Sequence, residues 1–321
     1  MDGPVITVCV STRNRAGLLP QLVARLEAQT IGADSFEVVI VDDGSTDDTW
    51  QVLQDLAAAS PLTIRTHRNE SSQGPAAGRN RAWRDAGAPL CAFTDDDCIP
   101  TPGWLEAAVS GLSGRNAAAA GRIMWPPYDE QLLGPFSRSL AVSKGNARWG
   151  ATANLIVQTE HLRRVDGFDE SFRFPAGEDT DLLLRILETD VDFAFLTDAL
   201  VYHRVEPAGL RALLRDQRRW ADIPAVIAKH PGARRALLYR GYYWREAHPR
   251  TLLLVAGLLA SPITPLASLL AVPWVHDRLC HDPVTDSRTE RVMVLPGRLV
   301  LDLVEIATMV RGSIKHKTLV L

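Results

Sequence analysis

In the first third of the chain, short β-branched runs alternate with segments whose apolar residues recur every three or four positions. The short runs predict strands, and the periodic segments predict helices between them. The expected strands span residues 5–10, 37–41, 62–67 and 90–94, and the expected helices span 18–29, 45–59, 76–86 and 102–112. Repeated strand–helix units of this length predict an α/β fold with a mostly parallel, doubly wound sheet.

The pattern changes twice further along the chain. Residues 124–150 are rich in Pro, Gly, Ser and Trp and predict a long loop, after which regular structure resumes at 151–157 and in a helix at 178–188. After about residue 249 long apolar stretches dominate. We therefore expect an α/β domain over residues 1–230 and a helical, partly apolar region over residues 231–321.

Composition narrows the classes of partner. The 321 residues are 46% hydrophobic, which is ample for a packed core. The 35 basic residues nearly balance the 38 acidic residues, and the formal net charge is −3. Such a chain has no general basic field to attract a polyanion, so we expect no nucleic acid as the main partner.

The cysteines predict a reducing compartment. The four cysteines form no Cys-x-x-Cys pair and no zinc-type spacing, and Cys9 and Cys91 lie within apolar strand-like runs. The start of the sequence has no basic segment followed by an apolar one, as a signal peptide would. We expect a cytoplasmic protein.

Three polar clusters follow expected strands, at residues 11–14, 42–45 and 95–97. Each alone is explained by a turn and a helix cap, and Ser45 in particular predicts a cap for the helix that follows it. Ligands of open parallel sheets lie beyond the carboxyl ends of the strands. The three clusters together therefore predict one polar crevice.

The sharpest cluster is Asp95-Asp96-Asp97, directly after a buried strand. Crowded carboxylates raise one another's pKa unless a cation neutralises them. Asp95 and Asp97 are two positions apart and can face one side, where Mg²⁺ or Mn²⁺ would be held together with a diphosphate. The cation would stabilise the negative charge on a departing nucleotide diphosphate. The alternative is a solvated acidic turn.

The second cluster predicts a contact with a nucleoside. A carboxylate at a strand end can accept hydrogen bonds from a base edge or a ribose hydroxyl, and Gly44 permits the turn that aims Asp43. Asp42 is the neighbouring alternative, and the sequence does not separate the two.

Two further features are candidates for chemistry. Glu178 and Asp179 open the helix at 178–188, where acids favour the helix dipole but where one of them, with its pKa raised by the other, could also serve as a general base. His203 ends another strand-like run and is either structural or a third metal ligand.

Seven stretches, taken together, resemble family-2 glycosyltransferases with the GT-A fold, and they occur in that family's order over about residues 5–205. They lie at 8–19 (VCVSTRNRAGLL), 38–49 (VVIVDDGSTDDT), 74–83 (GPAAGRNRAW), 93–105 (FTDDDCIPTPGWL), 151–157 (ATANLIV), 165–172 (VDGFDESF) and 177–185 (GEDTDLLLR). The resemblance implies a Rossmann-like, mostly parallel sheet flanked by helices with a helical apolar appendage. It makes residues 1–230 a nucleotide-sugar-binding and catalytic domain.

The resemblance also implies roles by position. On the donor side, the nucleotide-sugar would be contacted by Thr12, Arg13, Asp43 (at the base, usually uracil), Arg79, Asp95, Asp96 and Asn154. The divalent cation, Mn²⁺ or Mg²⁺, would be held by Asp97 with Asp95 and His203. Asp179 would be the catalytic base, and Glu178 would contact acceptor or donor hydroxyls.

The reaction implied is a single displacement that inverts the anomeric carbon, without a covalent nucleophile. Processive members carry Gln-x-x-Arg-Trp after the base, whereas this chain has Asp216 at the place of the glutamine, before Gln217-Arg218-Arg219-Trp220. The departure favours transfer of a single sugar. The acceptor stays open between a lipid carrier, an envelope glycan and a specialised-metabolite or carrier-bound aglycone.

The apolar region predicts contact with a surface. Residues 251–275 contain no charged residue, but Pro262 and Pro265 interrupt them, so we expect a shallow re-entrant hairpin or a buried helical pair rather than a bilayer crossing. Pro296-Gly297 is expected to open a second helix, followed by a basic stretch at 311–317. Peripheral attachment to the inner face of the cell membrane, a homodimer interface and intramolecular packing are the alternatives.

Two other functions fit parts of the sequence. A sugar nucleotidyltransferase shares the nucleotide-binding architecture, but residues 11–17 lack the glycine-rich loop that holds a triphosphate. A non-enzymatic, membrane-tethered α/β scaffold also places acids at strand ends, but it leaves Glu178 and Asp179 without a role.

Overall fold

The computed structural model describes residues 3–112, 116–144, 146–280 and 288–321. The chain forms two compact units. Unit 1 comprises Met1–Tyr128 and Ser139–Arg204, and unit 2 comprises Asp129–Arg138 and Val205–Leu321. The division into folding domains at residue 230 stays a prediction.

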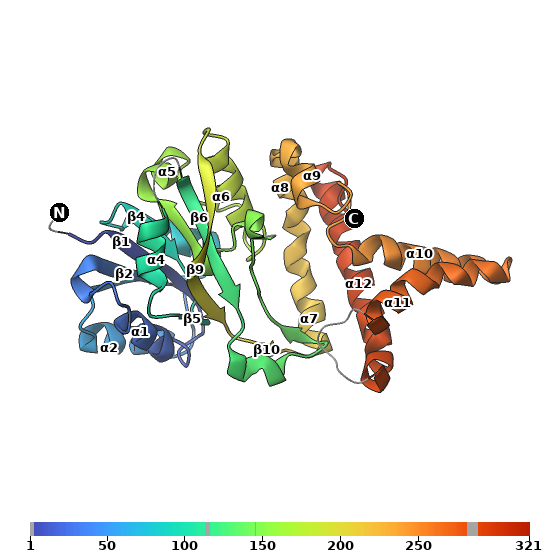
Figure 1. Ribbon diagram of the computed structural model, residues 1–321, viewed down its shortest axis with the longest axis horizontal. Helices are drawn as coiled ribbons and strands as arrows, with labels where there is room; N and C mark the ends of the chain where they lie inside the picture. Colours follow the sequence, from blue (N-terminus) through green and yellow to red (C-terminus); the bar gives the residue numbers. More distant parts are fainter. Residues whose placement is uncertain (1–2, 113–115, 145, 281–287) are drawn as a thin grey trace. The chain divides into compact units, whose positions relative to one another are not determined.

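Unit 1 contains an eight-stranded sheet in the order β3-β2-β1-β4-β8-β6-β9-β5 (Figure 1). Six strands run in one direction, and β8 and β5 run against them. The strands are β1 (Ile6–Thr12), β2 (Phe36–Asp42), β3 (Ile64–Arg68), β4 (Leu90–Phe93), β5 (Cys98–Pro100), β6 (Asn116–Met124), β8 (Leu155–Gln158) and β9 (Asp192–His203). The expected mostly parallel α/β sheet is confirmed.

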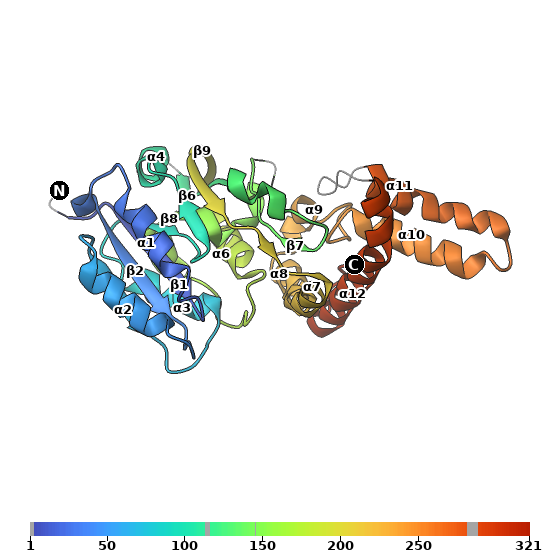
Figure 2. The ribbon, with the colours of Figure 1, turned by 90° about the horizontal axis from the view of Figure 1, so that it is seen from below.

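Helices cover both faces of this sheet (Figures 1 and 2). Residues of α1 (Leu19–Glu27), α2 (Thr49–Ala59) and α4 (Trp104–Gly111) share one apolar core, and residues of α3 (Pro75–Arg84), α5 (Thr159–Arg164) and α6 (Glu178–Leu187) share the other. Along β1, Ile6, Val8 and Val10 face the first core, while Cys9 faces the second. A strand buried on both faces reads as a continuous apolar run, as these residues do.

One local expectation is wrong, and one strand was not predicted from the sequence. Ser45 does not cap a helix, because its hydroxyl donates a hydrogen bond back to Asp42 and α2 begins only at Thr49. The alanine-rich segment at 116–124 is not an evident strand from its sequence, since alanine has low β propensity. It nevertheless forms β6, which is paired on both sides, with β8 and β9.

Unit 2 is largely helical, as expected. Its helices are α7 (Leu210–Asp216), α8 (Ile223–Lys229), α9 (Arg234–Leu237), α10 (Ala247–Ala260), α11 (Val272–Cys280) and α12 (Arg288–His316), with 3₁₀ turns at Gln217–Asp222, Pro231–Ala233 and Pro265–Ala271 and a ribbon of β7 (Ser137–Arg138) and β10 (Glu206–Pro207). Among the described residues, no helix is both long enough and apolar enough to cross a bilayer.

Pro296 does not open a helix, because α12 begins at Arg288 and runs through the proline. A proline inside a helix removes one backbone hydrogen bond, and packing can compensate for that loss. The next residue, Gly297, lies against Phe136, where an added Cβ would come 2.7 Å from the ring. The helix therefore continues through Pro296 at a place where it is closely packed.

A buried carboxylate joins three helices of unit 2. Asp302 in α12 accepts hydrogen bonds from Thr251 of α10 (3.1 Å), from the Trp274 indole of α11 (2.8 Å) and from Arg278 of α11 (2.8 Å to each oxygen). Asp302 is 7% exposed. A buried charge is tolerated when it is ion-paired and hydrogen-bonded, and Asp302 is both.

Replacing Asp302 by alanine should destabilise unit 2 strongly, because Arg278 and the Trp274 N–H would lose their acceptor in a buried place. We expect a loss of about 3–5 kcal/mol in the free energy of unfolding, measured by denaturant titration. Glu290→Ala, an exposed acid of the same helix, should change it by less than about 0.5 kcal/mol. Equal effects of the two substitutions would contradict the anchoring role.

Candidate functional site

The polar clusters that follow β1, β2 and β4 meet at one edge of the sheet. Thr12 pairs in register with Asp42, and the backbone N–H of Asp43 donates to the Thr12 carbonyl (2.8 Å). β4 lies on the other side of β1, and the Thr12 hydroxyl donates to the Asp96 carboxylate (2.6 Å). The three clusters therefore share one place, as the parallel topology requires.

The acceptor positions of the Asp43 carboxylate are occupied by donors of the loop that follows β3. Its oxygens accept hydrogen bonds from the side chains of Asn69 and Ser72 (2.8 Å each) and from the backbone N–H groups of Gln73 and Gly74 (both 2.9 Å). Burial alone would raise the pKa of Asp43, but these donors bring it below its ordinary value. A carboxylate offers about four acceptor positions, so this one is saturated and fixes the loop.

Its neighbour Asp42 is engaged differently. Asp42 accepts hydrogen bonds from the backbone and the hydroxyl of Ser45, and it lies 3.3 Å from the Arg68 guanidinium. Gly44 between these residues has a φ of 68°, and a Cβ there would lie 2.6 Å from the backbone of Ser71. Only glycine allows both the left-handed conformation and this close approach.

The three acids of the triplet face three different partners. Asp95 contacts Arg79 (2.9 Å), Asp96 contacts Thr12 (2.6 Å) and Asp97 lies beside His203 (3.3 Å). Burial and the charge of Asp97 raise the pKa of Asp96 to about 7, against the hydrogen bond from Thr12. Burial also raises the pKa of Asp97, while His203 opposes that shift. The triplet is therefore not a simple solvated turn.

Arg79 joins the end of β4 to the start of α6. Its guanidinium donates to Glu178 (2.8 Å) and to Asp95 (2.9 Å), and the residue is only 6% exposed. Although burial disfavours its charge, these two acids raise the pKa of Arg79, so it stays protonated. The resemblance predicts that Arg79 contacts the nucleotide. In this structure the side-chain hydrogen bonds of Arg79 go to Glu178 and Asp95. Arg13, by contrast, is exposed.

Glu178 and Asp179 occupy the first turn of α6, which follows Gly177 at a φ of 97°. Asp179 accepts a hydrogen bond from the backbone N–H of Thr180 (2.7 Å). Burial, together with the charge of Glu178, raises the pKa of Asp179 to about 8, although Arg79 opposes the shift. Burial likewise raises the pKa of Glu178, and Arg79 again opposes it. The helix start therefore carries a carboxyl group that titrates near neutral pH.

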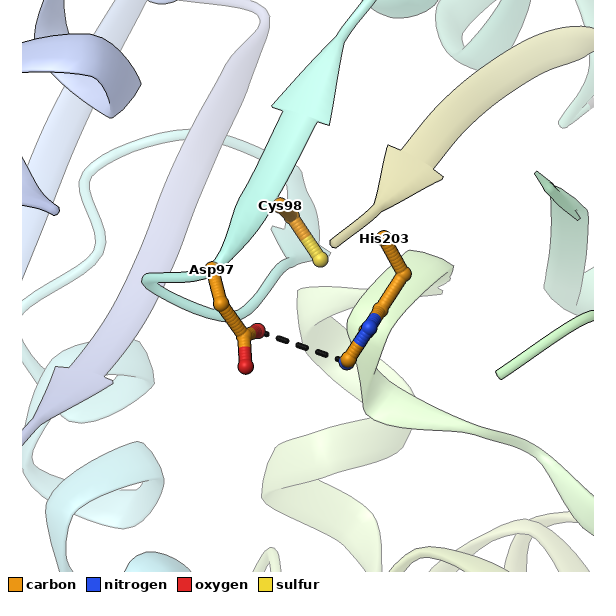
Figure 3. Close-up of side chains that lie close together, drawn as sticks. All are labelled: Asp97, Cys98 and His203. Carbon is orange, nitrogen blue, oxygen red and sulfur yellow. Dashed lines mark ion pairs between the residues drawn. The ribbon is translucent and has the colours of Figure 1, made fainter. Parts of the chain in front are cut away.

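Asp97, Cys98 and His203 place one potential ligand atom each within 4.8 Å of one another (Figure 3). Cys98 and His203 are register partners of the antiparallel strands β5 and β9, which explains their approach. His203 Nδ1 lies 3.0 Å from the Arg204 carbonyl. A carbonyl only accepts, so Nδ1 carries a proton, and Nε2 lies on the side of Asp97.

The donor set fits a hard divalent cation at two of these residues. Asp97 Oδ1 is buried and, among the residues the structure describes, accepts no hydrogen bond. Cys98 does not fit, because burial raises its pKa well above the ordinary value and its thiol donates to the Ala153 carbonyl (3.7 Å). A carboxylate oxygen and an imidazole nitrogen remain as the two ligands available from this cluster.

Asn154 lies inside unit 1, where both polar atoms of its amide have hydrogen-bond partners. Its oxygen accepts from the Trp104 indole (2.8 Å), and its nitrogen donates to the carbonyls of Arg122 (3.1 Å) and Ala199 (2.8 Å). Gly121 makes room for it, since a Cβ there would lie 2.2 Å from the amide nitrogen. The side chain ties β6 and β9 to the start of β8 and has no polar atom to spare.

Two participants were not singled out from the sequence. Arg15 places its guanidinium 4.0 Å from Asp96, and the loop at 69–74 surrounds Asp43. Arg15 could have been identified from its place in the polar run that follows β1. The loop at 69–74 could have been identified because it follows β3, whose end lies at the same edge of the sheet.

A family model described as glycosyl transferase family 2 matches residues 7–175 of this chain. The chain belongs to this family. A second model, glycosyl transferase family group 2, matches residues 130–281. The family-2 match spans both acidic clusters at the sheet edge, and the resemblance found in the sequence is confirmed.

Among curated proteins, two family-2 relatives illustrate the likeness. Validoxylamine A glucosyltransferase of Streptomyces hygroscopicus subsp. jinggangensis is 29% identical over 218 residues, which cover 57% of this chain and 51% of that protein. Pre-mycofactocin glycosyltransferase of Mycobacterium tuberculosis is 28% identical over 214 residues, covering 62% and 42%. The chain thus spans about half the length of these curated relatives.

Among solved structures, the mannosyltransferase PcManGT from Pyrobaculum calidifontis, in complex with GDP-Man and Mn²⁺, superposes with a TM-score of 0.61. The match covers 97% of this chain and 87% of that one at 21% sequence identity. At this identity the likeness concerns the fold, and it confirms the GT-A architecture for this family-2 chain.

Arg79→Met should destabilise unit 1 of this family-2 protein, because it leaves Asp95 and Glu178 without their shared cation. We expect a loss of about 3–5 kcal/mol in the free energy of unfolding, measured by denaturant titration. Arg84→Met removes an arginine of the same helix whose exposed ion pairs span 3.3–3.5 Å, and it should cost less than about 1 kcal/mol. Comparable losses would contradict the central position of Arg79.

Proposed function

We propose that this chain is an inverting glycosyltransferase that moves one sugar from a nucleotide-diphosphate sugar, UDP-linked, to an acceptor hydroxyl or other nucleophile. The observation that carries the proposal is the Arg79 bridge, which fixes Asp95 at the end of β4 beside Glu178 and Asp179 at the start of α6. The carboxylates that we assign to the donor side and to the acceptor side are thereby held close together. The family match supports the class of reaction.

The donor nucleoside would lie over the ends of β1 and β2. Thr12, Arg13 and Asp96 offer polar groups there, and Arg15 adds a second guanidinium near Asp96. Asp43 contributes by holding the loop at 69–74, whose backbone would contact the base. A uracil N–H could bond to Asp43 directly only by replacing one of the present donors. Asn154 contributes by fixing the start of β8.

Asp97 and His203 would hold the divalent cation, Mn²⁺ or Mg²⁺, since Oδ1 of Asp97 is buried without a hydrogen bond among the described residues and Nε2 of His203 lies 3.3 Å from it. When bound, the cation stabilises negative charge on the departing nucleotide diphosphate. Asp95 is the third ligand expected from the sequence, and its pairing with Arg79 leaves one carboxylate oxygen for that purpose.

Asp179 would remove the proton from the acceptor hydroxyl during attack on the anomeric carbon. A base works best when its pKa lies near the working pH, and burial with the Glu178 charge provides this for Asp179. Thr180 orients the carboxylate through its backbone N–H. Glu178 keeps Arg79 in place and bears the charge that tunes Asp179.

Transfer of a single sugar is favoured by Asp216, which stands where processive members have glutamine. In unit 2 this residue pairs with Arg138 (2.5 Å) and is used structurally. The acceptor that we propose is a lipid-linked carrier, an envelope glycan, or a specialised-metabolite or carrier-bound aglycone. We place the reaction in the cytoplasm at the inner face of the cell membrane, with a homodimer as a second mode for the C-terminal region.

Incubation of the purified chain with a panel of nucleotide-sugars and Mn²⁺ tests the proposal. We expect slow hydrolysis of one UDP-sugar, measured as release of UDP. Release of pyrophosphate from a nucleoside triphosphate and a sugar phosphate would favour a sugar nucleotidyltransferase instead. Calorimetry without any heat of binding for UDP and Mn²⁺ would favour the non-enzymatic scaffold.

Asp179→Asn should lower turnover by about 10²–10⁴-fold, because asparagine cannot accept the acceptor proton. Binding of UDP with Mn²⁺, measured by calorimetry, should be unchanged, since Asp179 is placed on the acceptor side. Asp97→Asn is the matched substitution and should instead weaken Mn²⁺-dependent UDP binding. Full turnover in the Asp179 variant would remove it as the base.

The rate should also depend on pH in a defined direction. Because the base must be deprotonated, kcat/KM should rise with pH through an apparent pKa of about 8. Glu178→Gln removes a negative charge beside Asp179 and leaves Arg79 less neutralised, so the midpoint should move to lower pH. A midpoint that stays in place would mean that another group controls the rate.

A further inference from the structure

Unit 2 contains a helical hairpin whose end is apolar and exposed. α10 leads into the turn, and the 3₁₀ segment Pro265–Ala271 and α11 return along it, so that the hairpin extends away from α12 (Figures 1 and 2). We define the hairpin tip as residues 258–272. Its exposed large side chains are Leu258, Leu259 (75% exposed), Ile263 (88%), Leu266 (73%), Leu269, Leu270 and Val272.

Most of these side chains lie outside the contact that closes the hairpin. Gly257 packs against the other arm, where an added Cβ would lie 2.6 Å from the Ala267 carbonyl and 2.9 Å from Leu270. The arms therefore meet closely at Gly257, Ala267 and Leu270. The most exposed side chains of the tip, Leu259, Ile263 and Leu266, are not part of this contact.

Backbone N–H groups of the turn have hydrogen-bond acceptors within the hairpin, as an environment without water would require. Ser261, Ile263, Thr264 and Ala267 donate their N–H groups to carbonyls within the hairpin (2.8–3.0 Å), and Pro262 and Pro265 have no N–H to satisfy. The hydroxyls of Ser261 and Ser268 donate to carbonyls one turn earlier, at 2.9 and 2.7 Å. Internal satisfaction of backbone groups is what a hydrocarbon phase demands.

Charge is confined to the opposite end of the hairpin. Residues 251–275 contain no charged side chain, and the flanking Arg250 pairs with Asp277 (2.8 Å). Beyond it, Arg278 pairs with the buried Asp302. From Arg250 to Ala260 the helix rises about 15 Å, which is the thickness of one hydrocarbon leaflet. The ion pairs would thus remain at the level of the headgroups.

We propose that the hairpin tip inserts into one leaflet of a phospholipid bilayer and docks the protein there. A protein partner would be expected to meet some polar rim around such a patch, whereas the tip has no charged residue on either arm. Insertion transfers at least six large apolar side chains from water to hydrocarbon. The inference concerns unit 2 alone and does not require the proposed sugar transfer.

Flotation of the full chain with vesicles tests this docking. We expect the protein to float with vesicles of phosphatidylcholine and phosphatidylglycerol. The variant Leu259→Gln, Ile263→Gln, Leu266→Gln should bind at least about a hundredfold more weakly, because three large apolar side chains are lost from the buried surface. Its melting temperature should not fall, since these residues are exposed.

The matched control changes three exposed apolar residues of α12. The variant Val292→Gln, Met293→Gln, Ile314→Gln should float like the wild type, although Met293 and Ile314 are 70% and 76% exposed. If the α12 variant loses binding and the tip variant keeps it, the proposal is wrong. A dimer in sedimentation that depends on the tip, without any flotation, would also overturn it and would assign the surface to a second copy.

A fluorescent label reports the position of the tip directly. Among the four cysteines only Cys280 is exposed, so Cys280→Ser with Ile263→Cys allows labelling at the tip. With vesicles, the emission of an environment-sensitive dye at the tip should shift to shorter wavelength, and a dye at Ile314→Cys should not respond. No shift at the tip would exclude insertion. Hydrolysis of the nucleotide-sugar without vesicles should be equal in all variants, which separates failure of docking from failure of the proposed function.

Discussion

The site depends on one buried guanidinium held between two carboxylates. Arg79 is nearly inaccessible to solvent, and its partners Asp95 and Glu178 come from the end of β4 and the start of α6, 99 positions from Arg79 in the second case. A buried cation without partners would be strongly destabilising, and so would either acid without the cation. The ion-paired trio therefore fixes the distance between a strand end and a helix start that nothing in the local sequence would bring together.

This arrangement gives neighbouring acids, which would otherwise repel one another, different partners and different pKa shifts. Asp95 is neutralised by Arg79, Asp43 is saturated by loop donors that lower its pKa, and Asp97 faces His203. The pKa of Asp179 shifts in the opposite direction to that of Asp43, because burial and the charge of Glu178 raise it. Groups of the same chemical type thus acquire different proton affinities within one site. Such separation is what a reaction with a distinct binding side and a distinct basic side requires.

The sequence predicts those features that depend on local pattern and on topology. Apolar runs predict β1 to β4, and the parallel topology predicts that Thr12, Asp43 and Asp96 meet. It does not predict which partner each acid takes, because the Arg79 bridge and the Asn69 contact depend on side-chain geometry across the fold. Alanine-rich β6 was missed since its burial, and not its propensity, makes it a strand, and α12 passes through Pro296 because packing outweighs one lost hydrogen bond.

The requirement that charges have partners also organises unit 2, with a different outcome. On α12 the acids Asp302 and Glu305 face inward, where Arg278 and Arg245 pair with them. The same helix buries Leu301, Ile306 and Met309 and exposes Val300, Leu303 and Ile314. Its inner face therefore combines ion-paired acids with apolar side chains, whereas a simple amphipathic helix would bury an apolar stripe alone. The contacts of Asp302 with Thr251, Trp274 and Arg278 hold α10, α11 and α12 together at their junction, away from the hairpin tip. The tip needs no such polar anchor of its own, and its exposed apolar surface costs free energy in water unless something covers it.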